Sequence, residues 1–117
     1  MSKEENKELL LRWYEAWSKG DSSLFDELYS SSYRYYFQAG EIWEREKTKT
    51  FYEKVIREGP DRMTLTDIMA EGDRVSVWLS CNGGLTAKGG LIRNLIHKFA
   101  DGKIVETRQG CIQKADQ

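Results

Sequence analysis

Apolar residues near the N-terminus recur with the spacing of an α-helix. The stripe consists of Leu10, Trp13, Tyr14 and Trp17. Residues spaced three and four apart lie on one helical face, so this stripe predicts a helix with one buried side. Ser2 and Glu5 have the S-x-x-E spacing of a capping box and predict its start, whereas Gly20 can take the left-handed conformation that closes it.

Two further helices are expected downstream. Asp21 can cap the first of these. Its inward positions are Leu24, Phe25 and Leu28. The serine run 30–32 is expected to end it. The second has apolar residues at helical spacing between positions 48 and 56, starts near residues 44–46 and ends before Pro60, which cannot continue a helix.

The apolar period changes to two in the second half of the chain. One strand has a uniformly aliphatic face made of Val75, Val77, Leu79 and Cys81. Other strands are expected over residues 33–37, 42–43, 63–70, 91–99 and 103–112. Residues 71–73 and 101–102 are typical of tight turns. This order of elements predicts one α+β domain over residues 1–117, in which a meander of antiparallel strands wraps around three helices.

Composition narrows the classes of function. The chain of 117 residues has 39% hydrophobic and 32% charged residues and a net charge of −1. This balance gives no electrostatic case for binding nucleic acid or an acidic membrane, and no apolar run approaches the length of a membrane span. Cys81 and Cys111 are too few for a disulfide framework or a metal cluster. We therefore expect a cytoplasmic protein with no metal and no cofactor.

Four segments carry a resemblance to a known family. They are residues 12–21 (RWYEAWSKGD), 28–29 (LY), 70–75 (AEGDRV) and 99–104 (FADGKI). In this order they resemble the SnoaL-like branch of the nuclear transport factor 2-like superfamily, whose members include polyketide cyclases, ketosteroid isomerases and scytalone dehydratase. The resemblance implies a cone, in which a strongly curved antiparallel sheet and its helices enclose a mostly apolar pocket for a small molecule.

The resemblance also implies a homodimer that forms through the convex face of the sheet. Trp78 lies between Ser76 and Ser80 on one face of its strand. An exposed Trp78 on the convex face would need cover and would support the dimer. The alternative is that Trp78 lines the pocket.

Three positions of the isomerase chemistry are apolar in this chain. The resemblance places Trp13 at the tyrosine of the first helix, Phe37 at the aspartate of the first strand and Leu95 at the acid of the third long strand. Because Phe37 and Leu95 cannot transfer a proton, we expect neither steroid isomerisation nor cyclisation by the usual acid. These three side chains become candidates for contact with the substrate.

Other polar residues supply candidate chemistry. His97 is the only histidine, and it shares a strand face with Leu95 and Arg93. Imidazole titrates near neutrality and can act as a general base or acid, although a lone histidine can also be a packed core group. Arg93 can hold an anionic or enolate oxygen, or lie in water at the rim.

Tyrosines provide the hydrogen-bond donors of this scheme. With His97, the catalytic candidates are Tyr14 and Tyr36. Alternation along the strand allows only one of Tyr35 and Tyr36 to face inward. The candidates for substrate binding are Trp13, Trp17, Tyr35, Phe37, Trp43, Arg93, Leu95 and Gln109.

Three functions follow as hypotheses. The first is a cofactor-independent enzyme for dehydration, isomerisation or cyclisation of a small apolar or aromatic substrate, with His97 as base or acid and a tyrosine as donor. The second is a ligand-binding or assembly module without catalysis, which the apolar replacements favour. The third is a role in protein interaction alone, which predicts no enclosed cavity.

Overall fold

The computed structural model describes residues 2–59, 63–81 and 91–114. Its elements are α1 (Lys3–Ser18), α2 (Phe25–Leu28), β1 (Tyr29–Tyr36), β2 (Ile42–Glu44), α3 (Arg45–Glu58), β3 (Met63–Glu71), β4 (Arg74–Cys81), β5 (Leu91–Ala100) and β6 (Lys103–Lys114). Within these ranges, no helix has the length and apolar character needed to cross a membrane.

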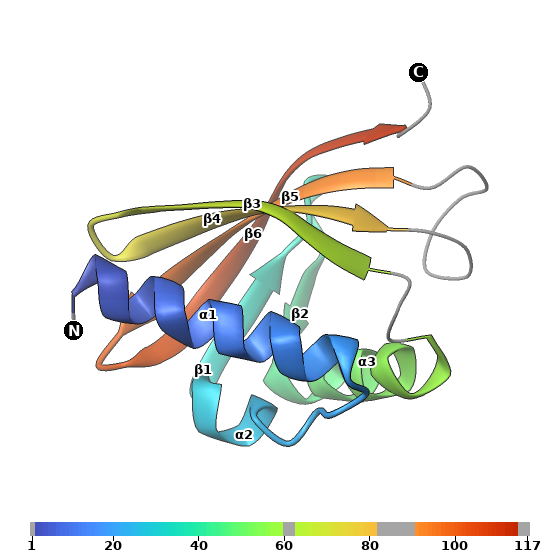
Figure 1. The fold of residues 1–117 in the computed structure, drawn as a ribbon, viewed down its shortest axis with the longest axis horizontal. Helices are drawn as coiled ribbons and strands as arrows, with labels where there is room; N and C mark the ends of the chain where they lie inside the picture. Colours follow the sequence, from blue (N-terminus) through green and yellow to red (C-terminus); the bar gives the residue numbers. More distant parts are fainter. Residues whose placement is uncertain (1, 60–62, 82–90, 115–117) are drawn as a thin grey trace.

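The strands form one six-stranded sheet in the order β2-β1-β6-β5-β4-β3. Figure 1 shows the sheet bending over the helices, with α1 beneath β3 and β4. The expected α+β fold, a curved sheet wrapped around helices, is confirmed. One pairing differs from the expected antiparallel meander, because β1 runs parallel to β6. The chain leaves the sheet through α3 and re-enters at the far edge as β3, so three antiparallel steps bring β6 beside β1 in the same direction.

Helix α1 begins and ends as predicted. The Ser2 hydroxyl accepts a hydrogen bond from the Glu5 amide at 3.1 Å, and the Ser2 amide donates to the Glu5 carboxylate at 2.9 Å. After the helix, Gly20 adopts a φ of 77° and donates to the Trp17 carbonyl at 2.9 Å. All four residues of the predicted apolar stripe are buried.

The segment after α1 differs from the prediction in two ways. Asp21 accepts a hydrogen bond from the Ser23 amide at 2.9 Å, so it stabilises the turn before α2 and does not cap the helix itself. The serine run lies inside β1 and does not end α2, which is only one turn long. Tyr29 and Tyr33 of β1 are almost fully buried, and burying these two rings draws the serines between them into the strand.

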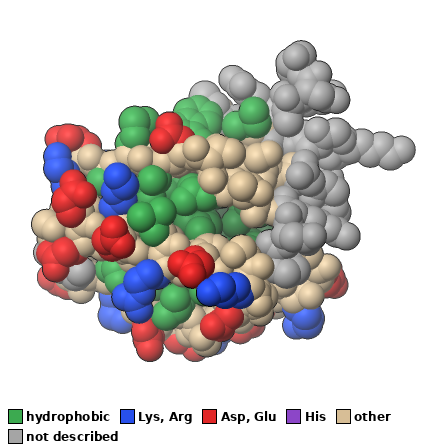
Figure 2. All heavy atoms as spheres, in the orientation of Figure 1, with side chains coloured by type: hydrophobic (Ala, Val, Ile, Leu, Met, Phe, Trp, Pro, Cys, Tyr) green, Lys and Arg blue, Asp and Glu red, His purple; other side chains and the backbone are tan. Residues whose placement is uncertain are grey.

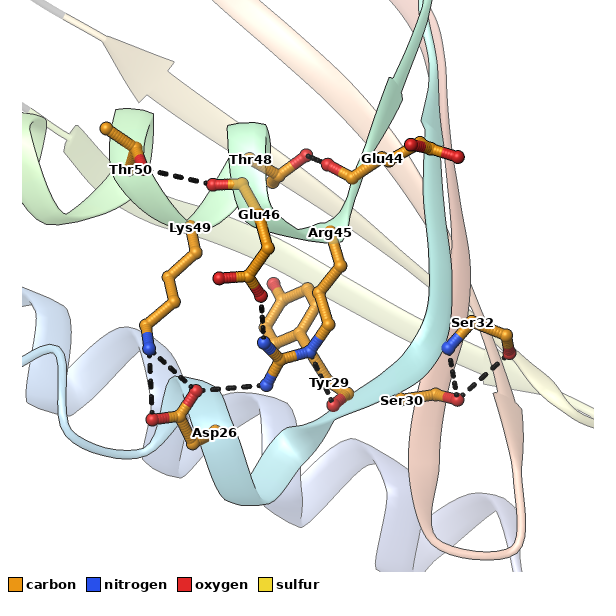
Figure 3. A network of polar contacts seen from close by, with 10 residues as sticks. All are labelled: Asp26, Tyr29, Ser30, Ser32, Glu44, Arg45, Glu46, Thr48, Lys49 and Thr50. Carbon is orange, nitrogen blue, oxygen red and sulfur yellow. Dashed lines mark hydrogen bonds and ion pairs between the residues drawn. The ribbon is translucent and has the colours of Figure 1, made fainter.

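A polar network fixes the start of α3 against α2 and β1 (Figure 3). The Arg45 guanidinium donates to Asp26 at 2.9 Å, to Glu46 at 2.6 Å and to the Tyr29 carbonyl at 3.4 Å. Lys49, one turn further along, also binds Asp26 at 3.0 Å. Such exposed ion pairs add little stability each. Their structural effect is to fix the orientation of the helix whose inner face forms one wall of the site described below.

Strand β4 has the predicted aliphatic face, because Val75, Val77, Leu79 and Cys81 are all buried. Trp78 points to the opposite, convex face and is partly exposed. The alternative that Trp78 lines a pocket is therefore wrong. Met69 of β3 is 56% exposed.

The pairing of β5 with β6 slips by one residue between Arg93 and Leu95. Asn94 lies at this slip, and its amide group donates to the Ser76 hydroxyl at 2.8 Å and to a carbonyl of β4 at 3.0 Å. A Cβ atom on Gly110 of β6 would overlap the Asn94 side-chain oxygen. Glycine at position 110 therefore lets the two strands approach each other beside the residues that sequence analysis assigned to the site.

Replacing Gly110 with Ala should lower the free energy of unfolding by about 1–3 kcal/mol. The added methyl group has to displace the Asn94 side chain, which holds two hydrogen bonds. Chemical denaturation measures the change. In an Asn94→Ala background the same substitution should cost less, and an equal cost in both backgrounds would contradict the overlap.

Candidate functional site

An aromatic cavity lies between the helices and the concave face of the sheet. Eight of the residues predicted from sequence line it: Trp13, Tyr14, Trp17, Tyr35, Phe37, Trp43, Arg93 and Leu95. The centre of a water molecule can occupy about 70 Å³ of this space, several times what a single water needs. The cavity is therefore narrow, and it counts against the hypothesis of a protein-interaction module, which predicts no enclosed cavity.

A groove on the surface adjoins this cavity. Figure 2 shows hydrophobic side chains gathered between α1 and the strand above it. Leu11, Tyr14, Met63 and Leu65 are among the residues that line this groove. Tyr14 and Met63 also line the cavity. The two spaces thus share a wall.

Tyr14, His97 and Thr107 form a buried chain of hydrogen bonds behind the cavity wall. The Tyr14 hydroxyl lies 3.0 Å from His97 Nε2, and His97 Nδ1 lies 2.8 Å from Thr107 Oγ1. The chain joins α1 to β5 and β6, where His97 and Thr107 face each other in register. His97 and Thr107 are fully buried. Only Tyr14 also lines the cavity, so it is the member that can touch a ligand.

Burial keeps His97 and Tyr14, the two titratable residues of this hydrogen-bonded chain, neutral. Desolvation lowers the pKa of His97 to about 3 and raises the pKa of Tyr14 well above its usual range. In both cases the low-polarity surroundings disfavour the charged form. At neutral pH the pair is thus an uncharged imidazole beside an uncharged phenol.

The tautomer of His97 decides which atoms donate in this chain of hydrogen bonds. The Thr107 hydroxyl, the neutral imidazole and the Tyr14 hydroxyl bring three protons to two hydrogen bonds. If Nδ1 carries the imidazole proton, His97 donates to Thr107, Tyr14 donates to His97, and the Thr107 proton is left for a partner outside the three residues, such as the neighbouring Tyr33 hydroxyl. If Nε2 carries it, Thr107 donates to His97, His97 donates to Tyr14, and the Tyr14 proton is the one left over. Only the second arrangement makes the Tyr14 proton available to a ligand in the cavity, whose wall includes Tyr14.

Tyr35 and Tyr36 lie on opposite faces of β1. Tyr35 is buried and lines the cavity, and Gln109 donates to its hydroxyl at 3.4 Å. Tyr36 lies on the outer face beneath the Arg108 guanidinium, which is 4.3 Å from its ring centre. Tyr36 is thus excluded from the cavity by strand alternation, and its assignment as a catalytic candidate is corrected.

His97 and Gln109 lie behind the cavity wall. His97 faces inward, as predicted, but Tyr14 stands between its imidazole and the cavity. Gln109 contacts Tyr35 and accepts a hydrogen bond from the Gln38 amide at 3.2 Å. Both residues can therefore act on a ligand only through a tyrosine.

Sequence reasoning missed one wall of the cavity. The missed residues are Thr48, Phe51, Tyr52 and Val55 of α3 together with Met63, Leu79 and Cys81. Their helical spacing and strand alternation marked most of them as core. Those patterns show which face is buried, but not whether the buried face meets other side chains or an empty space.

Arg93 is the only charged side chain among the described residues that line the cavity. Its Nε atom is buried and has no hydrogen-bond partner. Burial raises the pKa of Tyr35 and of the Cys81 thiol, and the Arg93 charge acts on both pKa values in the opposite direction. In the described ranges, no group of three or more histidine, cysteine, aspartate or glutamate side chains is placed to hold a metal ion.

Residues 10–107 match the family model of the SnoaL-like domain. The chain belongs to the SnoaL-like domain family. The match spans most of this SnoaL-like domain, from the first helix to the last strand. None of the curated proteins matches its sequence.

Solved structures share the fold of this SnoaL-like domain at low sequence identity. A nuclear transport factor 2-like protein of unknown function from Burkholderia xenovorans LB400 is 19% identical, with a TM-score of 0.78 and coverage of 97% of this chain and 87% of that chain. A protein from Jannaschia sp. CCS1, provisionally assigned as a SnoaL-like polyketide cyclase, is 18% identical, with a TM-score of 0.71 and coverage of 92% and 85%.

A third similar structure is a protein from Kribbella flavida DSM 17836, provisionally assigned as a ketosteroid isomerase. It is 18% identical, with a TM-score of 0.76 and coverage of 92% of this chain and 77% of that chain. These likenesses establish the fold of the SnoaL-like domain, and its chemistry has to be argued from its own cavity.

The buried imidazole should make the free energy of unfolding depend on pH. The folded pKa of about 3 lies below the ordinary 6.5, so the unfolded state binds one more proton between these values. The contribution to stability is complete above pH 6.5 and falls as the pH drops, by up to about 1.4 kcal/mol per pH unit.

Replacing His97 with Gln, which does not titrate, should remove this part of the pH dependence. Urea unfolding of both proteins between about pH 7 and about pH 5 measures the difference in slope. Other acidic groups affect both proteins alike and cancel. Equal slopes in the two proteins would show that His97 titrates normally in the folded state.

Proposed function

We propose that this domain binds a small, largely apolar ligand and polarises an oxygen atom of that ligand, promoting proton transfer without a cofactor. The reaction class is dehydration, isomerisation or cyclisation. The observation that carries the proposal is Tyr14, a residue of the cavity wall whose hydroxyl is hydrogen-bonded to His97, which Thr107 contacts in turn.

A neutral tyrosine and a neutral imidazole suit the stabilisation of developing negative charge. When a C–H bond next to a carbonyl loses its proton, charge gathers on the carbonyl oxygen. A fixed donor in an apolar site stabilises that charge, because no solvent has to reorganise. In the proposed arrangement Nε2 carries the imidazole proton, so His97 donates to the Tyr14 oxygen and strengthens Tyr14 as a donor.

This proposal changes the role expected for His97. The sequence suggested an imidazole that takes or gives the substrate proton directly. Tyr14 separates the imidazole from the cavity, and the lowered pKa makes it a weak base. His97 therefore acts as a positioning residue for Tyr14, and solvent or the ligand itself accepts the proton.

The second candidate is a binding protein without catalysis. Its support is the chemistry of the wall, since no aspartate or glutamate occurs among the described residues that line the cavity. A general base of the kind that carboxylates supply is thus missing from this part of the structure. Both candidates predict a bound small molecule, and they differ in whether that molecule exchanges a proton.

Two expectations from the sequence stay predictions. The homodimer through the convex face is supported by the exposed Met69 and by the partly exposed Trp78 on that face. The cytoplasmic location also stays a prediction.

Exchange of carbon-bound hydrogen separates the two candidates. Small conjugated ketones, acetophenone and cyclohexenone, are incubated with the protein in D₂O, and deuterium uptake next to the carbonyl is followed by NMR. The proposal predicts uptake faster than in buffer. Tyr14→Phe should slow the protein-dependent rate by about a hundredfold, the usual scale for losing one oxyanion donor, while binding persists.

The matched control is Tyr36→Phe, which removes the same hydroxyl from the outer face of β1. This variant should exchange at the original rate. Binding without faster exchange would favour the non-catalytic candidate. Exchange that is equally fast in Tyr14→Phe would remove Tyr14 from the proposed role.

A further inference from the structure

Among the described residues, none places an opposite charge beside the positive charge of Arg93 at the cavity. Arg93 lies on β5, pairs with Leu79 of β4 and faces the same side of the sheet as Leu95. Its Nε atom is buried and has no hydrogen-bond partner in the part of the chain that the structure describes. A buried donor that lacks a partner costs free energy, and a ligand that accepts from it would recover that cost.

The two other unpaired polar atoms that the described wall residues carry are also donors. Trp13 Nε1 and Trp17 Nε1 are buried without a hydrogen-bond partner, and both residues line the cavity. With the Tyr14 proton of the proposed function added, the described wall presents donors and a positive charge but no carboxylate. A ligand that complements this set carries acceptor oxygens and a negative charge.

The aromatic residues of the wall determine which uncharged group of a ligand can fit the cavity. Aromatic rings meet edge to face around the cavity, with centroids 5.1 Å apart for Trp17 and Tyr52 and 5.4 Å apart for Trp43 and Phe51. Such edges and faces pack well against a flat apolar group. The small free space limits that group to a compact one.

We infer that the cavity takes a small planar monoanion, an aromatic or conjugated carboxylic acid whose carboxylate binds Arg93. The guanidinium matches a carboxylate with two parallel hydrogen bonds, which a neutral amide or alcohol cannot reproduce. A single arginine balances one negative charge, which favours a monoanion over a phosphate dianion. This inference rests on the proposed function, because it names the ligand class of the same cavity.

Benzoate and benzamide test the inference directly. The two probes have nearly the same shape and differ in charge, and titration calorimetry measures the binding of each to the whole protein. Benzoate should bind at least about tenfold more tightly than benzamide, the usual scale of one charge-assisted hydrogen bond. Arg93→Gln should abolish this preference without changing the affinity for benzamide, and Arg93→Lys should keep part of it.

Arg108→Gln is the matched control, because Arg108 lies on the outer face over Tyr36. It should leave the preference for benzoate unchanged. Equal binding of both probes, or a preference that survives in Arg93→Gln, would overturn the carboxylate while leaving the cavity as a small-molecule site. Failure of both probes to bind would overturn the inference as well, and the deuterium exchange of the ketones would then decide separately whether the proposed function stands.

Discussion

The buried hydrogen-bonded chain of Tyr14, His97 and Thr107 is the constraint on which the site depends. It joins the first helix to the two strands at the centre of the sheet. Ionisation of His97 or of Tyr14 is unfavourable, because desolvation opposes the charged form of each side chain. The helix is thereby held at the concave face, and Tyr14 is held in the wall of a largely aromatic cavity.

Two electrostatic features of the cavity complement each other. Tyr14 offers a neutral donor, whereas Arg93 offers a fixed positive charge whose Nε has no partner. In an apolar space both interactions are stronger than they would be in water. A ligand with a carboxylate at one end and a polarisable oxygen elsewhere would use both. The convergence of these groups on one narrow space is what distinguishes this cavity from an ordinary core.

Local patterns in the sequence predicted most of the fold, but not all of the site. The capping box at Ser2, the left-handed Gly20 and the alternation along β4 each depend on neighbouring residues, and all were confirmed. The parallel pairing of β1 with β6 depends on how the chain crosses the sheet, which no local pattern records. Thr107 was missed for the same reason, because its role depends on a strand partner. To predict the orientation of Tyr36, one must know which residues of β1 face inward. The run of aromatic residues in this strand does not show this.

The direction of the hydrogen-bonded chain can be measured directly, because His97 is the only histidine in the sequence. Nitrogen-15 NMR of the imidazole reports which ring nitrogen carries the proton. The account predicts a neutral ring protonated at Nε2, unchanged between neutral and mildly acidic pH. Protonation at Nδ1 would turn the Tyr14 proton away from the cavity, and either that result or an imidazolium at neutral pH would contradict the account.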